Sequence, residues 1–82
     1  MVKKKHYSLV VYYAELNSYE YLTEVLQQIL GYEVTQAANC ASIVMEKGRY
    51  AVKTYKSQDL YKADITLDLL KQNGVPAKLT EL

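Results

Sequence analysis

The chain has 82 residues, half of them hydrophobic, with ten basic and nine acidic side chains and a net charge of +1. This length suits one domain with a modest core, and the hydrophobic fraction excludes a disordered chain. The near-neutral charge argues against nucleic acid as a partner, and no apolar run reaches the roughly 18 residues that a membrane span requires. We therefore expect one domain over residues 1–82, with residues 1–5 as a basic tail.

The cellular compartment is predicted from one cysteine and from the start of the chain. A single cysteine, Cys40, excludes an internal disulfide and fits a reducing compartment. The charged N-terminus leads into a strand pattern rather than a signal peptide. We therefore expect a cytoplasmic protein, monomeric in isolation.

The first predicted elements are a strand and a helix. Residues 6–13 are β-branched and aromatic, which favours a strand, and their apolar centre favours a central position in a sheet. Asn17 is expected to cap the first helix, paired with Glu20 in a capping box. Apolar residues recur at helical spacing over 22–30, and Gly31 ends the pattern.

A second helix and a second strand are predicted next. Small residues over 37–45 indicate the helix, with Thr35 as a possible cap and Gly48 at its end, and residues 50–55 read as the strand. An alternative assigns part of residues 32–49 to a strand and gives a ferredoxin-like βαββαβ fold. The many alanines favour the helix.

A third helix and a final strand complete the chain. The helix is expected to begin at Ser57, with Asp59 in its first turn near the positive end of the helix dipole, and to close at Asn73-Gly74. The strand is expected over 77–82, after Val75-Pro76. The apolar stripe of the helix is expected to contain Leu60, Ala63, Leu67 and Leu70, widened by Ile65 and Leu69.

The predicted order is therefore β-α-α-β-α-β. Three strands can form one small sheet with the helices packed on one face. The fold class is α+β, a small βααβαβ sandwich with a three-stranded sheet.

Few residues of this chain suit catalysis. Cys40 lies on the apolar stripe of its helix with nothing basic one turn away, so we interpret it as a buried, inert thiol. His6 is the only histidine, and no acidic residue stands at metal-ligand spacing from it. We expect no enzymatic activity, no metal and no cofactor. The candidate binding surface is the loop 13–19, with Glu15 and two tyrosines, although a loop that merely connects two elements remains the alternative.

One segment resembles a known family. The run Tyr19–Tyr32, YEYLTEVLQQILGY, is similar to the first helix of the ClpS proteins, adaptors that hand substrates to the AAA+ chaperones of the Clp protease. The resemblance covers His6 to Leu82 and implies the βααβαβ fold, which the C-terminal domain of the ribosomal stalk protein shares. Further matching positions are Ala37, Lys47-Gly48-Arg49, the strand 50–55 and Pro76 before Leu79-Thr80-Glu81.

The resemblance also implies a ligand site. Family members recognise a bulky N-terminal residue, the N-degron, by binding its free amino group with an Asn-Asp-Asp run and a histidine, and its side chain with an apolar pocket. The amine-binding positions fall on Tyr13, Ala14, Glu15 and Met45. The pocket wall falls on Asn17, Tyr19, Leu22, Ala41 and Val44. Because an ammonium requires acceptors and only Glu15 keeps a carboxylate, we expect altered or lost N-degron recognition.

The resemblance finally implies a partner. The family places an acidic residue and a nearby lysine on the third helix, which puts the expected chaperone contact at Lys62 and Asp64. The expected function is binding of the N-domain of a Clp AAA+ chaperone, with modulation of substrate delivery and peptides as possible further ligands. The alternative is a small interaction domain on the same scaffold that serves another complex, including a ribosomal-stalk-like role.

Overall fold

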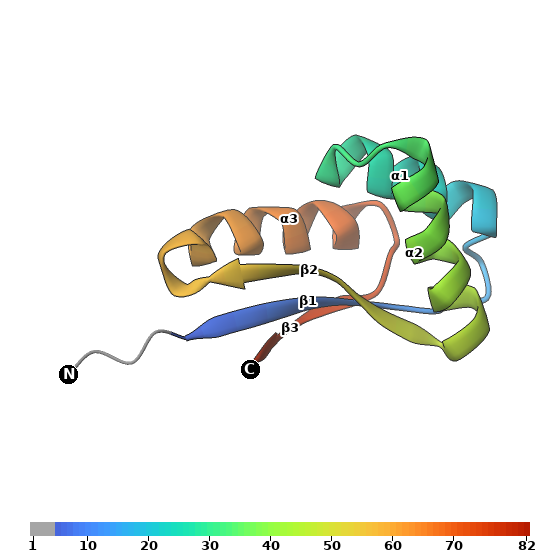
Figure 1. The fold of residues 1–82 in the computed structure, drawn as a ribbon. Helices are drawn as coiled ribbons and strands as arrows, with labels where there is room; N and C mark the ends of the chain where they lie inside the picture. The colour runs from blue at the N-terminus through green and yellow to red at the C-terminus, as the bar shows by residue number, and fades with distance from the viewer. Residues whose placement is uncertain (1–4) are drawn as a thin grey trace.

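The computed structural model describes residues 5–82, so the predicted basic tail lies outside the described residues except for Lys5. The helices and strands follow the predicted order, with a short 3₁₀ turn inserted before the last helix (Figure 1). The elements are β1 (His6–Tyr12), α1 (Tyr19–Leu30), α2 (Val34–Lys47), β2 (Arg49–Lys56), the 3₁₀ turn η1 (Ser57–Asp59), α3 (Leu60–Gln72) and β3 (Ala77–Glu81). Because residues 34–47 are helical, the ferredoxin-like alternative is wrong.

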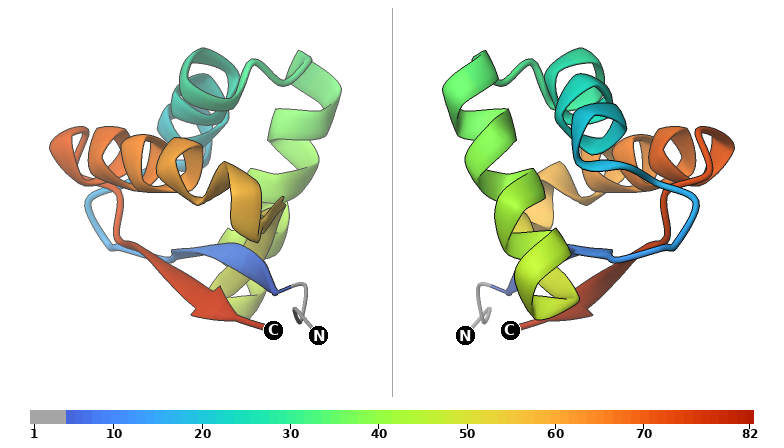
Figure 2. Two further views of the ribbon diagram at one scale, coloured as in Figure 1. Left: turned by 90° about the vertical axis from the view of Figure 1, so that its left-hand side faces the viewer. Right: turned by 90° about the vertical axis from the view of Figure 1, so that its right-hand side faces the viewer.

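The sheet has three antiparallel strands in the order β2-β1-β3, which confirms the central position of the first strand. All three helices lie on one face of this sheet, as the end views show (Figure 2). The pairing of β1 with β2 shifts register between Leu9 and Val10, where Val52 is the extra residue of a bulge. The Tyr32 hydroxyl donates a hydrogen bond of 2.6 Å to the Val52 carbonyl. That bond gives the bulge carbonyl a partner.

The core lies between the sheet and the helices. Leu9 and Val11 project from β1 toward the helices, since residues of equal parity share one face of a strand. The fully buried side chains that meet there from the helices are Leu22, Leu26, Ala37, Ala41, Val44, Ala63 and Leu70. Burial of such apolar surface is the main source of the stability of a domain of this size.

The first helix begins one residue later than the sequence predicts. Ser18, not Asn17, is the N-cap, and its hydroxyl accepts a hydrogen bond from the Tyr21 amide. Asn17 is instead buried, and its side-chain amide donates a bond of 2.9 Å to the Gly74 carbonyl. The Tyr21 hydroxyl donates to the Asn73 carbonyl beside it. These two contacts tie the start of α1 to the turn that follows α3.

We expect Asn17→Ala to destabilise the fold more than Ser18→Ala. The first change leaves a partly buried carbonyl without its donor, which costs about 1–3 kcal/mol, whereas loss of an N-cap typically costs about 1 kcal/mol. Urea unfolding followed by circular dichroism measures both free energies of unfolding. A smaller loss for the Asn17 variant would show that the Gly74 contact does not stabilise the fold.

The other two helices also differ from the prediction at their starts. Helix α2 has Glu33 as its N-cap, so Thr35 lies inside the helix and caps nothing. The segment that begins at Ser57 forms the turn η1 rather than the first turn of α3. Ile65 and Leu69 are exposed, so the expected widening of the buried stripe of α3 is wrong. Ala63 and Leu70 carry its buried contacts with the core.

Candidate functional site

The loop between β1 and α1 lies beside the end of α2 at one end of the sheet (Figure 1). The Tyr13 amide donates a hydrogen bond of 2.8 Å to the Gly48 carbonyl, which joins this loop to the residue that caps α2. The backbone amide of Asn17 donates a second hydrogen bond, of 2.9 Å, to the Ala14 carbonyl, which closes the loop into a tight turn. The loop therefore brings the residues proposed to hold an amine close to the last turn of α2, which carries Met45.

The residues assigned to the pocket wall are mostly inaccessible to solvent. Leu22, Ala41 and Val44 each have 0% relative exposure. A side chain that lined an open pocket would be reached by water, so no water-sized space lies against these three. Asn17 is also buried, and its side-chain amide donates to the Gly74 carbonyl. Tyr19 is the exposed member of the set. In this structure the wall positions are part of the core.

The positions assigned to amine binding face solvent and offer one charge. Glu15 is exposed and supplies the carboxylate, while Tyr13 and Met45 are also exposed but supply no carboxylate or imidazole. The Ala14 carbonyl already accepts a hydrogen bond from the Asn17 backbone amide. An exposed ion pair stabilises a complex by only about 0–1 kcal/mol. Glu15 alone would therefore hold an ammonium weakly.

The same end of the molecule carries an exposed apolar side chain that the sequence analysis did not assign to the site. Leu16 is 97% exposed at the tip of the loop, between Glu15 and Asn17. Its signal in the sequence is a leucine inside an otherwise polar loop. A fully exposed leucine is common on protein surfaces by itself. Leu16 lies in the same loop as Tyr13 and precedes Tyr19, which are both exposed, so it adds an apolar side chain to this loop.

The residues assigned to the chaperone contact lie on the solvent side of α3. Lys62 and Asp64 are both exposed, and the Lys62 ammonium is 3.9 Å from an Asp59 carboxylate oxygen. Between them runs a row of apolar side chains at the four-residue spacing that places them along one ridge of a helix. This α3 ridge contains Tyr61, Ile65 and Leu69, all of them exposed. Sequence reasoning had assigned two of these residues to the core.

The described residues were searched for groups of metal-binding side chains and for a reactive thiol. No group of three or more histidine, cysteine, aspartate or glutamate side chains in residues 5–82 could bind a metal ion. Burial raises the pKa of the Cys40 thiol, which disfavours the reactive thiolate. None of the helices within residues 5–82 combines the length and apolar character needed to cross a bilayer.

A family model and a solved structure are both similar to this chain. A family model described as ATP-dependent Clp protease adaptor protein ClpS matches residues 2–80. Among solved structures, the chain is similar to ClpS2 of Agrobacterium tumefaciens bound to L-phenylalaninamide, with a TM-score of 0.71 and 20% identity over 95% of each chain. No curated protein sequence matches the chain. The three-stranded antiparallel sheet with three helices is the architecture of that solved relative.

Proposed function

Because the chain belongs to the ClpS family of Clp protease adaptors, we propose that it binds the N-domain of a Clp AAA+ chaperone in the cytoplasm and modulates substrate delivery. We further propose that its recognition of free N-terminal residues is altered or lost. The observation that carries the second proposal is the complete burial of Leu22, Ala41 and Val44, where the family resemblance places the pocket wall.

The α3 ridge supports the proposed chaperone contact. Ile65 is 57% exposed, and Tyr61 and Leu69 flank it one helical turn away on either side. Lys62 and Asp64 place opposite charges next to this row. Interfaces commonly combine a few apolar anchors with a polar rim, and this helix presents both.

Calorimetric titration with the N-domain of the host's Clp ATPase tests this contact. We expect binding with a micromolar dissociation constant, weakened about tenfold by Ile65→Ser because an exposed anchor is lost without disturbing the core. Val34→Ser on α2, which removes an apolar side chain of 58% exposure, is the matched control and should bind as the parent chain does. No heat of binding at tens of micromolar N-domain would contradict the proposal and favour a different complex.

The proposed change in ligand recognition rests on the contrast with the solved relative. The Agrobacterium protein is bound to L-phenylalaninamide, a molecule with a free ammonium and an aromatic side chain. Such a ligand needs space for its ring and acceptors for three ammonium donors. In this chain the space is closed at Leu22, Ala41 and Val44, and Glu15 is the one carboxylate among the four amine-binding positions. We therefore propose that substrate peptides, if they bind at this end, contact its exposed surface rather than enter a pocket.

A further inference from the structure

A basic groove lies at the other end of the molecule, where the end of β2 turns into η1 and α3. It is built from two adjoining hollows. The larger, of about 430 Å³, is lined by Lys5, His6, Lys56, Ser57 and Gln58. The smaller, of about 270 Å³, is lined by Lys53, Thr54, Tyr55, Lys56, Gln58, Asp59 and Lys62. The two hollows share Lys56 and Gln58, and together they are called the basic groove below.

The charges of the groove are only partly neutralised. The Lys5 ammonium lies 3.0 Å from a Glu81 carboxylate oxygen, and Lys62 is paired loosely with Asp59 at 3.9 Å. Lys53 and Lys56 form no ion pair within residues 5–82. The Lys53 ammonium is instead held 5.0 Å from the centre of the Tyr55 ring. Lys53 and Lys56 can therefore bind an anion, and so can Lys62, because its ion pair with Asp59 is long.

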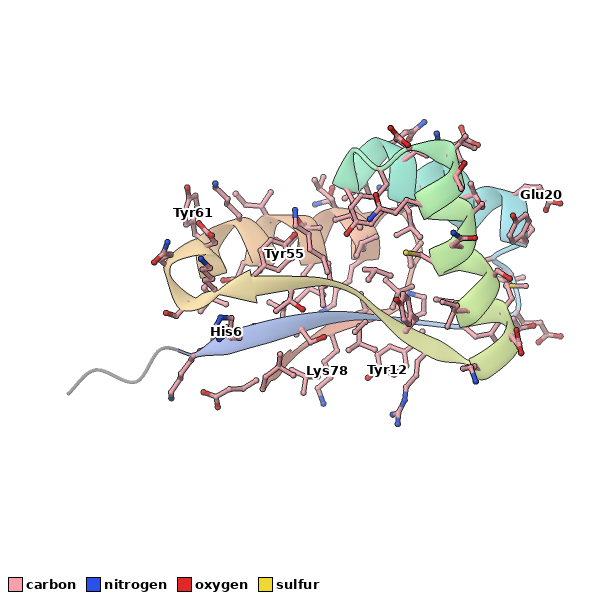
Figure 3. The ribbon with its side chains drawn as sticks, in the orientation of Figure 1. His6, Tyr12, Glu20, Tyr55, Tyr61 and Lys78 are labelled. Carbon is pink, nitrogen blue, oxygen red and sulfur yellow. The ribbon has the colours of Figure 1, made fainter. Side chains whose placement is uncertain are left out.

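The two ends of the molecule differ in charge. His6 and Tyr61 mark the end that carries the groove, and Glu20 lies at the opposite end (Figure 3). Helices α1 and α2 and the loops beside them carry five carboxylates, at Glu15, Glu20, Glu24, Glu33 and Glu46. An asymmetric charge distribution orients an approaching charged partner even when the net charge is small. An anionic partner is therefore directed to the groove.

We propose that the basic groove binds an acidic polypeptide segment. Its lysines are distributed over two hollows, which fits an extended chain of carboxylates better than a single compact anion. The Ser57 hydroxyl and the Gln58 amide add neutral hydrogen-bond donors for such a chain. Single-stranded nucleic acid fits less well, because it needs several exposed aromatic faces for stacking. Tyr55 in the lining is buried, which leaves the His6 imidazole as the exposed aromatic ring among the lining residues. The inference does not depend on the proposed chaperone, since an acidic segment of any protein has this chemistry.

Fluorescence polarisation with a fluorescein-labelled octaglutamate peptide tests the groove without any chaperone present. We expect saturable binding at low ionic strength that weakens steeply with added salt. Replacing one exposed lysine should weaken binding by about three- to fivefold, so Lys56→Gln should lose this much and Lys56→Gln with Lys53→Gln should lose more. Lys71→Gln is the control for charge, because Lys71 lies about 13 Å along α3 from Lys62 and should leave binding nearly unchanged.

Three results would overturn the inference. The first is the absence of saturable octaglutamate binding at low salt. The second is an equal loss from Lys71→Gln and Lys56→Gln, which would show attraction to net charge rather than to the groove. The third is tighter binding of a labelled oligothymidylate than of octaglutamate, with the same dependence on Lys56, which would make the groove a nucleic-acid site. All the replaced lysines are exposed, so each variant should fold as the parent chain does. Circular dichroism spectra of the variants check this.

Discussion

Replacing Leu22 with alanine should lower the free energy of unfolding by about 2–5 kcal/mol, since truncating a fully buried leucine removes apolar burial and leaves a cavity. Leu22 has 0% exposure and packs in the core cluster. A residue that lined a solvent-filled pocket would already contact water, and its truncation would cost less. Urea unfolding of the parent chain and the variant measures the difference.

Leu16→Ala is the matched control for that experiment. It deletes the same atoms from a leucine that is 97% exposed in the loop before α1, so it should change the free energy of unfolding by no more than about 0.5 kcal/mol. If Leu22→Ala cost as little as Leu16→Ala, the wall of the predicted pocket would not be core, and the account of a closed pocket would be wrong.

L-Phenylalaninamide, the ligand of the solved relative, should show no specific binding to this chain. Leu22, Ala41 and Val44, to which the resemblance assigns the pocket wall, are fully buried, and Met45 stands where the resemblance places a histidine. What remains is one exposed carboxylate, Glu15, whose attraction for an ammonium amounts to about 0–1 kcal/mol. That energy changes an affinity by about fivefold at most, far from what a specific site requires.

Most of the fold could be predicted because its signals are local. Gly31 and Gly48 both have the positive φ of a left-handed helix cap, a conformation that glycine adopts without strain. The apolar spacing over residues 22–30 then sets the buried face of α1. Each of these signals acts within one or two turns of the chain, so the sequence alone predicts it.

The errors lie where distant parts of the chain decide the outcome. Asn17 and Ser18 are both good caps by residue type, and the Asn17 side chain is taken by Gly74, 57 residues away. Ile65 and Leu69 lie on the solvent side of α3, away from the face on which Ala63 and Leu70 contact the core, so no neighbouring layer covers them. Residue type marks them as apolar, but only their place around the helix shows that they point away from the core.

The candidate sites also divide into what local sequence signals predict and what contacts between distant residues decide. The resemblance predicts the positions of the ligand site by their place in the sequence. Whether the space between them is open depends on packing among three elements, which no local pattern reports. The basic groove was missed because Lys5 lies 51 residues before Lys56 in the chain and comes beside it only through the pairing of β1 with β2. The basic run that ends at Lys5 was interpreted as a tail and not as part of a site.

The most direct test of the central claim, an adaptor fold with a closed N-terminal-residue pocket, is NMR titration of the methyl-labelled chain with L-phenylalaninamide. The methyl groups of Leu22 and Val44 report on the pocket wall, and N-acetyl-L-phenylalaninamide, which lacks the ammonium, is the control ligand. We predict no saturable shift of these methyl resonances at millimolar ligand, with the same small changes for both compounds. Saturable shifts at micromolar L-phenylalaninamide that disappear on acetylation would contradict the claim.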